Sequence, residues 1–109
     1  MNDENRQILE QFQALQQQLQ SVLMQKEDAK LQIMEAEKAL DELNKQGISE
    51  AYKIVGQIMI KKEINEIKKE LEEKISDLEV RTKALDKSEE RIVNKLKELE
   101  PKIKTLIQK

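Results

Sequence analysis

The side chains in this sequence that could do chemistry are carboxylates and ammonium groups, because cysteine and histidine are both absent. Their absence removes thiolate nucleophiles, imidazole acid–base groups and the usual zinc ligands. The charged residues recur at helical spacing, as in Glu66, Glu70 and Lys74, which is typical of a solvated helix surface. No pattern directs two carboxylates into a dry cleft, and there is no glycine-rich phosphate loop. We therefore expect no catalytic, metal or cofactor site, and expect function to lie in surfaces.

Composition points to long helices in one domain, 1–109. The chain is 39% charged and 2% aromatic, with two glycines and one proline, a usage that favours helices over a globular core. A net charge of −2 gives no long-range field toward nucleic acid or an anionic membrane. The aromatic residues are Phe12 and Tyr52, so a nucleic-acid arm with stacking side chains is discounted. No apolar run is long enough to span a bilayer.

Two apolar heptad ladders of equal length predict a long antiparallel two-helix coiled coil, with helices over 5–46 and 63–108. Steps of three and four keep the ladder side chains on one seam of each helix. The first ladder is Ile8, Phe12, Leu15, Leu19, Val22, Lys26, Ala29, Ile33, Ala36, Leu40 and Leu43. The second has an apolar residue at every seventh position: Ile64, Leu71, Leu78, Leu85, Ile92, Leu99 and Leu106.

Matching the ladder lengths predicts a register in which Leu43 pairs with Ile64, so that Ile8 lies level with Leu99. Lys26 occupies a core position of the first ladder. We expect its stem to pack on the seam and its ammonium to reach water, with a register-setting role as the alternative. Glu89, together with Thr82 on the second helix, indicates a loosened seam at mid-arm.

The segment 50–62 between the ladders predicts a β-hairpin. It is rich in residues of strand propensity around one glycine that can supply the turn. Apolar residues point to both faces of such a hairpin, which is marginal alone in water and prone to edge pairing. We therefore expect it to pair with hairpins of other subunits. The assembly residues are Tyr52, Ile54, Val55, Gly56, Ile58, Met59 and Ile60.

The free ends of the two helices carry a widened apolar stripe. Between Gln7 and Gln25 the chain has eight glutamines and one formal charge, which favours either a solvated face or a contact surface that does not repel partners. Pro101 is expected to kink or loosen the last turns. Phe12 and Leu99 either close the coil or contribute to the contact surface. Partial exposure is expected for Ile8, Leu9, Ile103, Leu106 and Ile107.

Several segments resemble the β-type subunits of prefoldin, in their archaeal form. They are Ala51–Gly56, Gln57–Lys62, Gln16–Gln20, Ala36–Leu40 and Leu71–Arg81. The resemblance extends over nearly the whole chain, and its most specific element is the Tyr-Lys-x-Val-Gly sequence that begins at Tyr52. Heptads alone are weak support, because any coiled coil supplies them.

The resemblance implies a cytoplasmic heterohexamer of two α-type and four β-type subunits, in which hairpins form a β-barrel body and the coiled coils project from it. Such a complex captures unfolded polypeptides without ATP and delivers them to a group II chaperonin. The client-contacting tips would correspond to Ile8, Leu9, Phe12, Leu99, Ile103, Leu106 and Ile107. The competing interpretation is a structural coiled-coil scaffold or assembly adaptor without chaperone activity. The hairpin discriminates between them, because a plain helical hairpin needs only a short polar turn.

Overall fold

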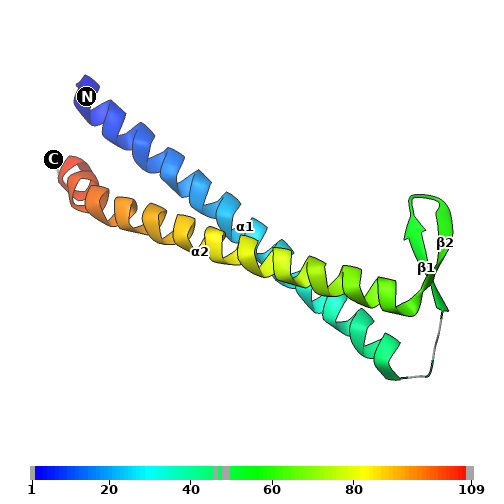
Figure 1. Ribbon diagram of the computed structural model, residues 1–109. Helices are drawn as coiled ribbons and strands as arrows, with labels where there is room; N and C mark the ends of the chain where they lie inside the picture. Colours follow the sequence, from blue (N-terminus) through cyan, green and yellow to red (C-terminus); the bar gives the residue numbers. More distant parts are fainter. Residues whose placement is uncertain (1, 46, 48–49, 108–109) are drawn as a thin grey trace. The chain divides into compact units, whose positions relative to one another are not determined.

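The computed structural model describes residues 2–45, 47 and 50–107. Two long helices, α1 (Asp3–Lys45) and α2 (Ile64–Ile107), are joined through an antiparallel hairpin of β1 (Glu50–Val55) and β2 (Ile58–Glu63) (Figure 1). The predicted fold, mainly helical with one hairpin between the helices, is confirmed. The predicted element bounds agree to within two residues wherever they can be compared, while Gln46 and Gln108 lie outside the described residues.

Local chemistry accounts for the way the helices begin and continue. At the start of α1 the side chain of Asn2 accepts a hydrogen bond from the backbone N–H of Asn5 at 2.8 Å, as an N-cap does. α2 does not end at Pro101 but continues to Ile107. Pro101 lies on the exposed side of the helix, so the carbonyl left without its usual donor can bond water. The expected loosening at Pro101 therefore does not break the helix.

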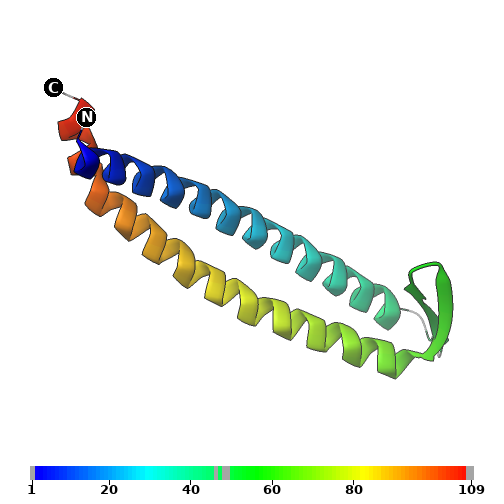
Figure 2. The ribbon, with the colours of Figure 1, turned by 90° about the horizontal axis from the view of Figure 1, so that it is seen from above.

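The chain divides into two compact units, each containing part of both helices. The terminal unit comprises Met1–Glu27 with Lys83–Lys109, and the hairpin unit comprises Asp28–Thr82. In the terminal unit the start of α1 and the end of α2 lie at the same end (Figures 1 and 2). Its core is a seam of buried residues with half-buried neighbours: Leu15, Val22, Ile92 and Leu99, flanked by Ile8, Phe12, Leu19, Leu85 and Leu96.

The ion pairs of Lys26 reveal the register of the two helices in the terminal unit. Its Nζ atom lies 2.7 Å from Oδ1 of Asp86 and 3.2 Å from Oε2 of Glu89. Because both helices rise equally per residue, this antiparallel offset places Leu15 level with Leu99. Both of these leucines are buried in the same cluster, in agreement with the offset.

The predicted register, with Ile8 level with Leu99 and Leu43 level with Ile64, is wrong by one heptad. In the hairpin unit, Leu43 and Leu71 line the same groove, which is the offset seen in the terminal unit. Equal ladder lengths do not determine the register, because an apolar seam that repeats every seven residues fits equally well after a slip of seven. The ion pairs of Lys26 identify the alignment that the structure adopts.

The hairpin turns through Gly56 and Gln57, between the facing residues Val55 and Ile58. Gly56 has a φ of 61°, and no other described residue has a positive φ. A positive φ at the first turn position alone corresponds to a type II′ turn, whose twist matches that of the strands. Gly56 therefore supplies the turn, as the sequence predicts.

Glu70 of α2 connects the hairpin to the helix that follows it. Its carboxylate accepts hydrogen bonds from Lys62 Nζ at 2.6 Å and from Lys53 Nζ at 3.0 Å. These bonds, the one from Lys62 foremost, hold the pKa of Glu70 below its usual range. The sequence placed Glu70 on a solvated helix surface, whereas the structure directs it toward the hairpin.

We predict that Gly56→Ala weakens the hairpin. A side chain at positive φ costs about 1–2 kcal/mol, so amide hydrogen exchange in β1 and β2 should accelerate about tenfold. Gln57→Ala is the matched control, because that residue also lies exposed in the turn but has no positive φ. Equal exchange rates in the two variants would contradict the turn assignment.

We also predict that acid loosens the attachment of the hairpin to α2. The pKa of Glu70 is lowered in the folded chain, so its ion pairs stabilise the attachment at pH values above the ordinary glutamate pKa of about 4.3. They are lost as the pH falls through the lower, folded value. Carboxyl NMR titration measures this pKa directly. In the Lys62→Met variant it should move upward, and an unchanged value would show that the ion pair is not formed.

Candidate functional site

The hairpin exposes an unusual amount of apolar surface. Ile54 is 70% exposed, and five further large apolar residues in these two strands are also exposed: Tyr52, Val55, Ile58, Met59 and Ile60. All of the predicted assembly residues thus lie on one short element, together with the turn residue Gly56. Large exposed apolar groups gathered in this way mark interaction surfaces on soluble proteins.

The strand register distributes these residues over both faces of the hairpin. Facing residues of an antiparallel pair lie on one side of the sheet. Lys53 faces Ile60 and Val55 faces Ile58, so these four share the face whose lysine contacts Glu70. The opposite face presents Tyr52, Ile54 and Met59. Apolar residues on both faces are exposed within the described chain, so the hairpin leaves apolar surface open on both sides.

A groove of about 540 Å³ lies beside the hairpin within the hairpin unit. Its lining is largely apolar and comes from both helices and from β1. The apolar residues that line it are Ala39, Leu43, Ala51, Tyr52, Ile67 and Leu71. Because Tyr52 belongs both to this groove and to the exposed face of β1, the groove extends the apolar surface of the hairpin toward the helices.

The end of the terminal unit carries a second, smaller apolar surface, which we call the tip surface. Ile107 is 74% exposed. The other members are half-buried, because the seam covers one side of each. The tip surface comprises Ile8, Leu9, Phe12, Leu106 and Ile107.

Leu99 and Ile103, which the resemblance also assigned to the tips, are buried. Their exposed fractions are 7% and 9%. The expected partial exposure of Ile103 is therefore wrong, because the observed register places it opposite α1. These two residues close the coil, which was one of the alternatives for Leu99.

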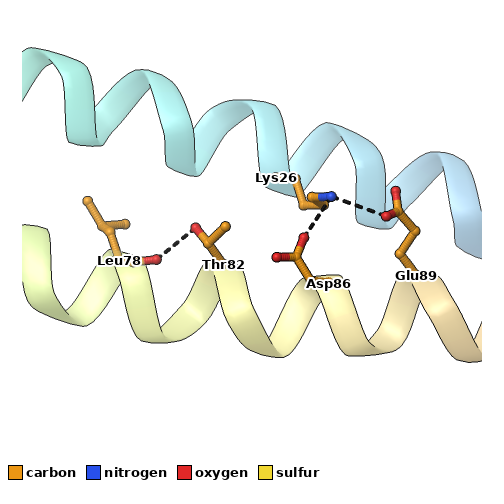
Figure 3. A network of polar contacts seen from close by, with 5 residues as sticks. All are labelled: Lys26, Leu78, Thr82, Asp86 and Glu89. Atoms are coloured by element: carbon orange, nitrogen blue, oxygen red, sulfur yellow. Dashed lines mark hydrogen bonds and ion pairs between the residues drawn. The ribbon is translucent and has the colours of Figure 1, made fainter.

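Lys26 lies in a polar layer of the terminal unit, which we define as Lys26, Asp86 and Glu89 (Figure 3). Its side chain is 15% exposed, and hydrogen bonds to the two carboxylates raise its pKa. The side chain therefore lies on the seam, as expected, and its ammonium is paired with two carboxylates of α2. Asp86 had no place in the sequence prediction, although its spacing of three from Glu89 puts both carboxylates on one side of α2. In the hairpin unit, Thr82 donates a hydrogen bond to the carbonyl of Leu78 at 2.8 Å (Figure 3).

Other chemistry finds no support in the part of the chain that the structure describes. Within it, no group of three or more acidic side chains is placed to hold a metal ion. None of the described helices is long and apolar enough to cross a membrane. Some apolar residues off the ladders are also exposed, and the sequence analysis did not single them out: Leu23, Met24, Leu31, Met34 and Val80.

Comparison with known proteins gives one consistent result. The family model described as "Prefoldin subunit" matches residues 6–109. The prefoldin subunit beta of Thermococcus onnurineus is 42% identical over 103 residues, covering 92% of this chain and 87% of the relative. That of Archaeoglobus fulgidus is 36% identical over 101 residues, covering 92% and 87%.

A solved structure agrees with these relatives. The crystal structure of the prefoldin beta subunit from Thermococcus strain KS-1 superposes with a TM-score of 0.82 at 38% identity. The match covers 99% of this chain and 96% of that chain. These findings favour a prefoldin chaperone subunit over a structural scaffold. With its two helices, its hairpin between them and these relatives, the chain belongs to the prefoldin family, as a chaperone subunit of the β type.

Proposed function

We propose that this chain is part of a cytoplasmic, ATP-independent holdase that captures unfolded polypeptides at its tip surface and delivers them to a group II chaperonin. The single observation that carries the proposal is the apolar surface left open at the tip, where Ile107 is 74% exposed beside four half-buried apolar residues. The prefoldin family consists of chaperones without enzymatic activity, and we propose the same for this chain.

We propose that the hairpin joins the chain to α-type prefoldin subunits and to further copies of itself, in a complex of two α-type and four β-type chains. Two strands alone are marginal in water, and their outer edges present unpaired backbone groups. Pairing these edges with other hairpins into a barrel satisfies the edges and buries Ile54 and its apolar neighbours.

Client capture follows from the modest size of each tip surface. Full burial of one large apolar side chain contributes about 1.5–3 kcal/mol, so a half-covered group contributes about half of that. One tip therefore holds a client weakly and releases it quickly. Several tips on one assembly raise the effective concentration and give useful avidity. Apolar contact without shape-specific pockets suits many unrelated unfolded chains.

We predict that the triple variant Ile8→Ser, Leu9→Ser and Ile107→Ser captures clients at least about tenfold more weakly, because three apolar contacts are lost from each tip. The measurement is suppression of aggregation of a denatured client by the assembled complex. Because Ile8 packs against the core cluster, Ile107→Ser alone serves as a second variant that leaves the seam intact.

Val80→Ser is the matched control, since Val80 is an exposed apolar residue of α2 outside the tip surface. It should leave client capture unchanged, and all variants should keep the mass of the assembled complex. If the assembled tip variants protect the client as well as the unchanged protein does, the proposed capture site is wrong.

We predict that Ile54→Lys with Met59→Lys prevents assembly. These two residues face each other on the side of the hairpin opposite the Lys53 contact with α2. Lysines there would bring uncompensated charge into a buried interface. Light scattering on a sizing column, after mixing with an α-type subunit, should find separate chains. Gln57→Lys in the turn is the control. A full-size complex from the double variant would exclude this face as an interface.

A further inference from the structure

The polar layer interrupts an otherwise apolar part of the seam. Lys26 Nζ lies 2.7 Å from Asp86 and 3.2 Å from Glu89, with side-chain exposures of 15% for the lysine and 30% for Glu89 (Figure 3). On the side of the layer nearer the tip, the neighbouring core residues are Val22 and Ile92, both buried, and on its other side Leu85 packs against the same cluster. Asp86 is 54% exposed and remains hydrated while it contacts the ammonium.

An apolar seam with a heptad repeat does not by itself select one alignment. After a slip of seven residues, leucine and isoleucine again face leucine and isoleucine, with similar burial. The polar layer has no such equivalent. A slip toward the length-matched register would put Lys26 opposite Thr82 and Glu89 opposite Leu19. The opposite slip would put Lys26 opposite Leu96.

Each slip therefore separates the partly buried Lys26 from the partly buried Glu89. A charge enclosed in an apolar seam without its partner is strongly unfavourable, whereas a close pair with good hydrogen bonds is tolerated. No described buried polar side-chain atom lacks a hydrogen-bond partner in the observed alignment, the polar layer included. The charged groups thus raise the free energy of the slipped alignments more than they lower the free energy of the observed one.

The alignment also determines which apolar residues the tip exposes. In the observed register Ile8 lies level with Leu106, and Ile103 is buried against α1. In the length-matched register, Leu106 and Ile107 would lie beyond the start of α1 at Asp3. Ile103 would then face the polar first turn of α1. The slip would open much of the seam at this end.

We propose that the polar layer of Lys26, Asp86 and Glu89 sets the register of the coiled coil, and thereby fixes which apolar side chains the tip presents. The apolar ladder supplies the stability of the helix pair, and the three charged groups select one of its heptad-related alignments. The consequence for client capture rests on the proposed function, whereas the register itself does not.

The test measures the register by pulsed electron spin resonance between two spin labels. The chain has no native cysteine, so Gln11→Cys and Lys87→Cys provide unique labelling sites, both exposed and both in the terminal unit. A slip of one heptad changes the axial separation of these sites by about 10 Å. In the labelled protein without further changes, one distance population is expected.

The decisive variant is Lys26→Leu with Glu89→Leu, which completes the apolar ladder. Replacement of a buried ion pair by packed apolar groups does not lower stability in general, so the melting temperature should stay the same or rise. The distance distribution should gain a second population displaced by about 10 Å. A single population at the original distance would overturn the proposal, because the register would then be set elsewhere, for example by the connection between α1 and β1.

A charge-reversed variant separates charge pairing from local packing. Lys26→Glu alone places a carboxylate against the two carboxylates of Asp86 and Glu89 and should displace the distance distribution. The triple variant Lys26→Glu, Asp86→Lys and Glu89→Lys restores the pairing and should restore the single distance. Failure of the triple variant to restore it would also overturn the proposal. Lys45→Met is the control, because Lys45 pairs within α1 with Glu42 at an exposed site. Client capture by these variants is measured separately, so a failed client assay leaves the register result standing.

Discussion

A seam between two helices covers only one stripe of each, and this limit governs the rest of the molecule. In the terminal unit the seam buries Leu15, Val22, Ile92 and Leu99, and the remaining surface of both helices faces water. Among the residues that the structure describes, those buried in the seam are apolar. The apolar residues that the seam cannot cover form the exposed apolar surfaces of the molecule.

The polar layer and the apolar ladder have complementary roles in that seam. The ladder buries apolar area in any of several alignments, whereas Lys26 and Glu89 are satisfied in only one of them. The apolar ladder thus stabilises the helix pair, whereas the charged residues select its register. The number of apolar groups exposed at the tip depends on the register, because the register decides whether Ile103 is buried or open.

In the hairpin, too, the residues that define the structure differ from the residues that remain exposed. Gly56 and the facing strands define its shape, and Glu70 anchors one face through Lys53 and Lys62. These contacts are polar and leave the apolar residues of both faces open. A hairpin that is well defined but uncovered suits an element completed by neighbouring subunits.

The sequence by itself determined the element types, their bounds, the turn at Gly56 and the family. Heptad spacing, strand propensity around a single glycine and the Tyr-Lys-x-Val-Gly element are local signals, legible without knowledge of what packs against them. They also identified the hairpin as an apolar surface, because alternation places its apolar residues on both faces.

Only the tertiary structure decided the register, and with it the burial of Ile103 and the partners of Lys26. These depend on which residues of α1 face which residues of α2, and a heptad repeat leaves that choice open by seven residues in either direction. The same holds for Glu70. Its helical spacing predicts a surface position, but it does not predict the ion pairs with Lys53 and Lys62 of the hairpin. Local pattern determines the face of a helix, whereas the facing residue is set by long-range contacts, here by the pairing of charges within the seam.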